Sequence, residues 1–296
     1  MKKLESILVG VDFSDSSIRA LQEAGRLSRR DAANLHVIHS VTPEFVEHYR
    51  DSFDSPKTEI LEKIRAQLSS FAAGHLPAEL KFESDVFVGR PYDELERASN
   101  SFSADLVILG SHGLTVGSHR VGNIATRSVR KLPRPVLLVR ESHVGEFKTV
   151  VAAIDLSDTS APVLQQAATI AAGDKSKLHI LHVHCPPWLW LSSSVYGINS
   201  VPNPEYETEY RRTLDDQLAS AILPIREEFP DLEIIDTIVE DESTAPVIRD
   251  YLIENNADLA VIGSHGSGGL KAMFLGTTAE RMICDSPCSV LTVKAK

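Results

Sequence analysis

Internal duplication is the feature of this 296-residue sequence that most constrains its fold. The apolar segment that ends at Asp12 recurs before Asp155, which lies 143 residues later (155 − 12). The next apolar segment, residues 35–40, recurs at 178–183 with the same offset. Because a constant offset indicates repetition of one folding unit, we expect two domains of the same architecture.

The offset between the two halves grows only where loops are expected. Gly110 recurs as Gly263, at an offset of 153 (263 − 110), so the second half has gained ten residues before this point. We assign this gain to residues 185–204. Residues 136–139 recur as 290–293 at an offset of 154 (290 − 136), which is one residue more than the offset at Gly110.

The inserted segment contains both tryptophans of the sequence, Trp188 and Trp190, among several prolines. It follows the carboxyl end of an expected strand, where a loop can close over a ligand or contact a partner. Packing of the two rings on their own domain is the other interpretation, and the sequence does not choose between them.

Within each half, apolar strand-like segments alternate with helical patterns. Strands are expected in the first half at 7–11, 35–40, 82–88, 106–109 and 136–139. Helical patterns are expected at 18–27, 57–71, 92–99, 124–131, 161–172, 205–229, 244–255 and 278–284. This alternation predicts, for each half, an α/β domain with a parallel sheet and helices on both faces. We place the domains at residues 1–142 and 147–296, with a linker around residues 141–148.

Charge and composition exclude several classes of protein. A formal net charge of −11 argues against nucleic-acid binding, which needs a basic surface. Neither a secretory leader nor an apolar run long enough for a membrane span occurs, so we expect a cytoplasmic protein without a membrane partner. The three cysteines, Cys185, Cys284 and Cys288, lack paired metal-ligand spacing and are expected to be reduced thiols.

A glycine-rich loop at residues 263–277 follows the apolar run 259–262. Such a run is typical of a buried parallel strand, and open α/β sheets bind ligands at the carboxyl ends of their strands. Glycines let a phosphate approach backbone N–H groups, and the helix that follows would direct its amides at an anion. Thr277 and Glu280 have capping-box spacing at the start of that helix.

The combination of Asp155, Gly263-x-x-Gly266 and Gly276-Thr277 resembles the ATP-binding signature of the universal stress protein family. In that signature two glycines are followed, after nine residues, by Gly with Ser or Thr. The resemblance extends over nearly the whole chain, once in each half. The chain is therefore similar to tandem members of the family, of the kind called type E in bacteria. The resemblance implies two Rossmann-like, adenine nucleotide alpha-hydrolase-like domains, each with a five-stranded parallel sheet of order 3-2-1-4-5.

The resemblance also implies an ATP site in the second domain, with Mg²⁺ as the accompanying ion. From adenine to the phosphate tail, the implied binding residues are Ile154, Asp155, Val183, Gly263, His265, Gly266, Gly276, Thr277 and Thr278. Asp155 would face ribose or a phosphate-bound metal ion, although a helix cap is its alternative role. His265 is expected to shape the loop through backbone contact, and no metal site made by protein side chains is expected.

The first half departs from this signature. Only eight residues separate Gly113 from Gly122, and Asn123 replaces the hydroxyl residue. We therefore expect ATP to bind chiefly in the second half. The weaker counterparts in the first half are Asp12, Gly110, Gly113, Gly122 and Asn123.

The sequence contains no nucleophile-and-base pair and no P-loop lysine, so we assign no catalytic residue and expect a regulatory nucleotide-binding module of the stress response. Slow ATP hydrolysis and an interaction protein that binds no nucleotide are the alternatives. Family members dimerise through their last strands, which implies pairing of residues 136–139 with 290–293 within the chain. A homodimer of the whole chain is left open.

Overall fold

The computed structural model describes residues 3–113, 121–157, 159–189, 203–264 and 276–294. The chain divides into two compact units, Met1–Gly145 and Glu146–Lys296. Two predicted site residues, His265 and Gly266, lie outside the described residues, and so does Trp190.

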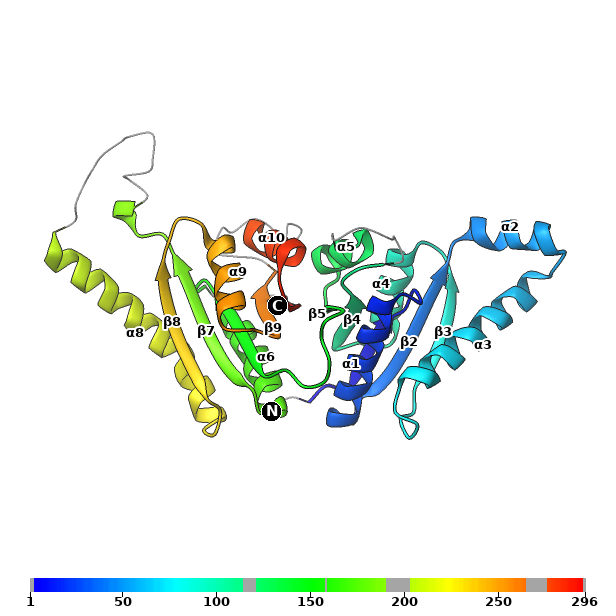
Figure 1. Cartoon of the computed structure of the whole chain (residues 1–296), viewed down its shortest axis with the longest axis horizontal. Coiled ribbons are helices and arrows are strands. Elements are labelled where there is room, and N and C mark those ends of the chain that lie inside the picture. Colours follow the sequence, from blue (N-terminus) through cyan, green and yellow to red (C-terminus); the bar gives the residue numbers. More distant parts are fainter. Residues whose placement is uncertain (1–2, 114–120, 158, 190–202, 265–275, 295–296) are drawn as a thin grey trace. The chain divides into compact units, whose positions relative to one another are not determined.

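Unit 1 contains a parallel sheet in the order β3-β2-β1-β4-β5 (Figure 1). The predicted strand order is therefore confirmed for this unit. Its elements are β1 (Ser6–Gly10), α1 (Asp15–Asp31), β2 (Asn34–Val41), α2 (Pro43–Phe53), α3 (Lys57–His75), β3 (Glu83–Val88), α4 (Pro91–Ser101), β4 (Leu106–Gly110), α5 (Asn123–Lys131) and β5 (Val136–Val139).

Unit 2 repeats this sheet in the order β8-β7-β6-β9-β10, again with parallel pairing. This order is the same 3-2-1-4-5 arrangement, so the prediction is confirmed here too. Its elements are β6 (Thr149–Ile154), α6 (Ser160–Asp174), β7 (Lys177–His184), α8 (Pro204–Glu228), β8 (Ile234–Glu240), α9 (Thr244–Glu254), β9 (Leu259–Gly263), α10 (Thr277–Asp285) and β10 (Ser289–Val293).

Helices cover both faces of each sheet. Right-handed crossovers on this strand order place α1 and α3 on one face and α4 and α5 on the other. The contacts agree, because α1 packs against α3 and α4 packs against α5. The central strand β1 is fully buried at Ile7, Leu8 and Val9. Burial on both faces explains why the strands are continuous apolar runs in the sequence.

Helix α2 was not expected from the sequence. Its N-cap is Thr42, whose side chain accepts a hydrogen bond from the Phe45 N–H at 3.3 Å, and Pro43 occupies the first helical position. Both residues are common helix-start signals. The helix was missed because its stripe of apolar residues is mostly exposed, with Val46 as the buried member.

The duplication extends to individual backbone angles. Non-glycine residues with left-handed φ occur at equivalent positions of the two units, after the first helix and before the fourth strand. They are Ala32 (57°) with Lys175 (56°), and Ser103 (49°) with Asn256 (47°). Because such angles are uncommon outside glycine, their recurrence supports the repeat independently of side-chain identity.

Two aspartates fix the start of the central strand in each unit. Asp105 Oδ2 accepts hydrogen bonds from the N–H groups of Glu5 and Ser6 at 2.8 and 3.1 Å. Asp258 Oδ2 binds the two corresponding N–H groups at the start of β6, at 2.7 and 3.0 Å. These bonds satisfy donors at the strand end that the sheet itself leaves unpaired.

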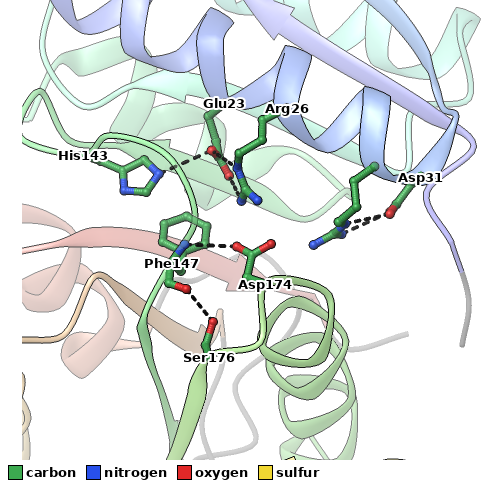
Figure 2. Close-up of polar contacts among 8 residues, drawn as sticks. Glu23, Arg26, Asp31, His143, Phe147, Asp174 and Ser176 are labelled. Carbon is green, nitrogen blue, oxygen red and sulfur yellow. Dashed lines mark hydrogen bonds and ion pairs between the residues drawn. The ribbon is translucent and has the colours of Figure 1, made fainter.

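A second aspartate binds the residue that lies two positions before this strand. Asp31 Oδ2 accepts from the Leu4 N–H at 3.2 Å. Asp174 Oδ2 accepts from the Phe147 N–H at 3.1 Å, as Figure 2 shows. In unit 2, Ser176 Oγ also donates to the Phe147 carbonyl at 2.6 Å. The amino end of the central strand is thus held by side chains from two directions.

The last residues of unit 1 are attached to α1 by a buried polar cluster. His143 Nε2 lies 3.3 Å from Glu23 Oε2. Arg26 donates to the same carboxylate from Nε and from a terminal nitrogen, at 2.9 and 2.7 Å (Figure 2). Glu23 is only 3% exposed, so its charge is compensated inside the unit.

Gly110 allows α1 to approach the end of β4. A Cβ atom added there would lie 2.6 Å from Ser16 Oγ and 2.7 Å from the Ser16 carbonyl carbon, whereas one added at Gly74 in α3 would meet nothing within 4 Å.

We expect Gly110→Ala to lower the free energy of unfolding by about 1–3 kcal/mol. Gly74→Ala should instead raise it by about 0.5 kcal/mol. Urea unfolding of both variants checks this, and equal effects would contradict the close approach.

The Asp31 carboxylate should make the stability depend on acid pH. Burial raises its pKa, but the hydrogen bond and charge of Arg30, the Leu4 N–H and the charge of Lys3 together lower it below the usual value. A lowered folded-state pKa gives stability that is present above the unfolded pKa and lost as the pH falls through the folded value.

We therefore expect the stability advantage of the wild type over Asp31→Asn to shrink as the pH falls below about 4. Melting temperatures measured for both proteins from pH 7 to pH 3 check the prediction. A difference that stays constant over this range would show that the charge of Asp31 does not contribute.

Candidate functional site

Asp155 organises the turn between β6 and α6. Its Oδ1 accepts from the Ser157 N–H at 3.1 Å, from Ser157 Oγ at 2.6 Å and from Ser160 Oγ at 3.3 Å. Leu156, between them, has a left-handed φ of 57°. The N-cap of α6 is Thr159, so Asp155 does not cap the helix. The alternative role considered for Asp155 is therefore wrong, and the carboxylate instead holds the turn.

Unit 1 builds the same turn at Asp12. Asp12 Oδ1 accepts from the Ser14 N–H at 3.1 Å and from Ser14 Oγ at 2.5 Å. Phe13 has φ 64°, and Ser14 caps α1 by accepting from the Ser17 N–H at 3.2 Å. A left-handed backbone at a bulky residue is strained, and such strain concentrates at functional sites. Its presence in both units marks this turn as a retained feature.

A histidine supports the strand end just before each acidic residue. His39 Nδ1 lies 2.7 Å from the Val11 carbonyl oxygen, and His182 Nδ1 lies 3.0 Å from that of Ile154. Because a carbonyl only accepts, Nδ1 carries the proton in both rings. These histidines were not predicted from the sequence, although they share the offset of 143 (182 − 39) with the acidic residues.

The helix after each glycine loop returns to the end of the preceding strand. The Gly122 N–H donates to the Ser111 carbonyl at 3.0 Å, and the Gly276 N–H donates to the Ser264 carbonyl at 3.1 Å. These bonds bring the amino ends of α5 and α10 to the carboxyl ends of β4 and β9. In open α/β sheets this is the edge at which ligands bind.

The predicted cap of α10 is wrong by one residue. Gly276, not Thr277, is the N-cap of α10, and Gly122 is the N-cap of α5. Within the described ranges no side chain caps either helix, and the predicted capping box of Thr277 with Glu280 does not form because Gly276 is the N-cap. Backbone N–H groups at a helix start without such a cap are suited to an anion.

The predicted residues of unit 2 that are described lie on this edge. Ile154 and Val183 are at the ends of β6 and β7, and Gly263 ends β9. Thr277 and Thr278 form the first turn of α10. Strand β6 pairs with both β7 and β9, so the acidic turn lies between the base side and the phosphate side of the predicted site.

In unit 1 the acidic residue directly faces the glycine loop. A Cβ atom added at Gly113 would lie 3.1 Å from Asp12 Oδ2. A Cβ atom added at Gly122 would lie 3.8 Å from the Gly113 nitrogen. The structure thus brings together Asp12, Gly113 and Gly122, with Gly110 at the end of β4 and Asn123 at the start of α5.

His112 in the loop of unit 1 is engaged at both ring nitrogens. Nδ1 lies 2.8 Å from Ser111 Oγ, and Nε2 lies 3.5 Å from a terminal nitrogen of Arg140. A guanidinium only donates, so Nε2 accepts and Nδ1 donates to the serine. This arrangement orients the loop and does not present a base to a substrate.

The described part of the insertion packs on its own unit. The Trp188 ring lies 5.1 Å from that of Tyr210 and 6.4 Å from that of Tyr206, both on α8. The His184 ring lies 5.8 Å from that of Tyr210 and is stacked on His182 at 5.6 Å. Both ring nitrogens of His184 are buried, and neither has a hydrogen-bond partner in the described part of the chain. Burial, followed by the charge of His182, lowers the pKa of His184, which favours its neutral form.

Across the described ranges, no group of three or more His, Cys, Asp or Glu side chains is arranged to hold a metal ion. Nor does any helix in the described part of the chain have the length and apolar character needed to cross a membrane.

The fold and the edge site define a duplicated α/β protein in which each unit presents an acidic turn at the carboxyl edge of its sheet. The model of the universal stress protein family matches residues 3–140 and 146–294, one match in each unit. The chain therefore belongs to the universal stress protein family, as a tandem member.

Relatives and solved structures agree with this assignment. Universal stress protein Rv2005c of Mycobacterium tuberculosis is 24% identical over 296 residues, covering 95% of this chain and 94% of that protein. Universal stress protein E of Photorhabdus laumondii is 25% identical, covering 99% and 96%. A crystal structure of a universal stress protein from Archaeoglobus fulgidus has a TM-score of 0.63 at 19% identity and covers 98% of each chain. This last likeness shows the fold alone.

The role of Asp155 in the turn leads to a stability prediction. Asp155→Ala removes the acceptor of the hydrogen bonds from Ser157 and Ser160 and should lower the free energy of unfolding by about 1–2 kcal/mol. Asp155→Asn keeps an acceptor oxygen in place and should cost clearly less. Urea unfolding of the two variants provides the measurement, and equal losses would show that charge, not hydrogen bonding, holds the turn.

Proposed function

We propose that unit 2 binds an adenine nucleotide, chiefly ATP, as a regulatory module of a stress-response protein. The observation that carries the proposal is the hydrogen bond from the Gly276 N–H to the Ser264 carbonyl. It brings the start of α10, which has no side-chain cap, to the strand edge beside the Asp155 turn. Helix amides and dipole at that point favour a phosphate.

The phosphate tail would bind the first turn of α10. Thr277 and Thr278 carry hydroxyl groups on this turn, and Thr277 is exposed. Gly276 at the N-cap leaves room for close approach of a phosphate to the backbone. The loop residues Gly263, His265 and Gly266 would contact the ribose and the nearer phosphates through their backbone.

The base would lie at the ends of β6 and β7. Ile154 and Val183 would offer backbone groups there, and the bond from His182 fixes the Ile154 carbonyl. A fixed carbonyl is a defined acceptor, although it already receives one hydrogen bond. Carbonyl oxygens have two lone pairs, so a second donor from a base is compatible with this contact.

A magnesium ion would accompany the phosphates. The predicted site offers it one carboxylate, that of Asp155, whose Oδ1 already holds the turn. A single carboxylate together with phosphate oxygens and water suits Mg²⁺, which keeps several waters when it binds. The ion would neutralise charge on the phosphate tail, and Asp155 would orient it.

Unit 1 is proposed to bind nucleotide more weakly. The hydrogen bond from the Gly122 N–H to the Ser111 carbonyl matches the one from Gly276 to Ser264 in unit 2. This backbone contact is therefore the same in the two units and does not explain a difference in affinity. The difference is chemical, because the shorter loop ends in Asn123 and lacks the hydroxyls of Thr277 and Thr278. Both hydroxyls add hydrogen-bond donors for a phosphate.

Matched glycine variants test the site. Gly276→Val should weaken ATP binding at least about tenfold, because its side chain would fill the space that the phosphate needs. Gly122→Val makes the same change in unit 1 and should leave the affinity within about twofold of the wild type. Titration calorimetry of the whole chain with ATP and MgCl₂ measures both, and circular dichroism confirms folding.

Three results would contradict this proposal. Unchanged affinity in Gly276→Val would remove the loop from the site. Loss in Gly122→Val alone would place the nucleotide in unit 1. A wild-type chain that binds no ATP would favour the alternative of an interaction protein without nucleotide.

A further inference from the structure

Unit 2 contains a pocket of about 610 Å³ between the start of α6 and the middle of α8. Leu156, Ser157 and Ala161 line it from the α6 side. Among the residues that the structure describes, no predicted nucleotide-binding residue lines it. The pocket is therefore a feature of the unit in addition to the strand-edge site, and its volume lies in the range of small-molecule sites.

The chemistry of the lining is that of hydroxyl, amide and carboxylate groups. Thr213, Asp216, Gln217 and Ser220 line the pocket from α8, opposite Ser157. No lysine or arginine is among the described residues that form its wall. Such a surface both donates and accepts hydrogen bonds but offers no counter-charge to an anion. It fits an uncharged ligand that carries several hydroxyl groups.

Unit 1 fills the corresponding corner with larger side chains. Phe13 and Ile18 stand at the positions of Leu156 and Ala161, at the common offset of 143 (156 − 13). The Phe13 ring lies 5.1 Å from that of Phe71 on α3, in an edge-on contact. Smaller residues at the same positions therefore accompany the opening in unit 2.

Ser157 connects this pocket with the nucleotide site. It lines the pocket, and its Oγ donates to Asp155 Oδ1 at 2.6 Å. The same Oγ lies 2.9 Å from Thr159 Oγ1. A ligand that hydrogen-bonds to Ser157 would compete with these contacts and so alter the position of the Asp155 carboxylate.

We propose that the pocket between α6 and α8 binds small uncharged polyols or sugars, and that its occupancy changes nucleotide affinity through Ser157 and Asp155. The coupling rests on the proposed function of unit 2. Binding of the polyol itself does not, because the pocket is built from other residues.

Direct binding is the first test. Glycerol, glucose and maltose are titrated into the full chain and followed by saturation-transfer NMR, with glucose 6-phosphate and putrescine as charged comparators. Ala161→Ile, which introduces the residue of unit 1, should weaken binding of the best sugar at least about tenfold. Ala219→Ile makes the same change on α8 outside the pocket, at an exposed position, and should leave binding unchanged.

Two outcomes of these titrations would contradict the proposal. Absence of binding by all three uncharged probes, or equal binding to Ala161→Ile, would overturn the site. Tighter binding of either charged comparator would overturn the ligand class.

The coupling is measured with ATP titrations in the presence and absence of saturating sugar. The wild-type ATP affinity should shift by about fivefold, and that of Ala161→Ile should not shift. Sugar binding without any ATP binding would refute the proposed function and the coupling while the pocket proposal stands. Competitive displacement of sugar by ATP would show that the pocket is part of the nucleotide site, and would overturn a separate site.

Discussion

The turn after the central strand of each unit is the constraint on which the candidate site depends. Phe13 and Leu156 are forced into left-handed backbone at this turn, which costs on the order of 1–3 kcal/mol at each. The carboxylates of Asp12 and Asp155 offset that cost by accepting hydrogen bonds from the serine two residues later. The same bonds hold an acidic group at the carboxyl edge of the sheet.

The surrounding structure supports this turn in the same way twice. A histidine fixes the carbonyl before each acidic residue, and a glycine N–H joins each helix start to the end of the fourth strand. The two units differ in features that lie outside this shared arrangement. Unit 2 has the longer loop with Thr277 and Thr278, and smaller residues beside the pocket. A duplicated scaffold with one specialised copy accounts for both proposals.

The sequence predicts the repeat and the strand order because buried parallel strands are continuous apolar runs at constant offsets. It does not predict the left-handed Phe13 and Leu156, since glycine and asparagine are the residues that normally indicate such a turn. Helix α2 had a readable start at Thr42 and Pro43, but its exposed apolar face gives little burial pattern. The pocket depends on side chains from two helices distant in sequence, so only the fold reveals it.

The central claim is that one of two similar units is the nucleotide site. The most direct measurement is the number of ATP molecules bound per chain, determined by native mass spectrometry of the intact protein with ATP and magnesium. The account predicts a single bound ATP at concentrations that saturate the stronger site. Two equivalent bound nucleotides, or none, would contradict it.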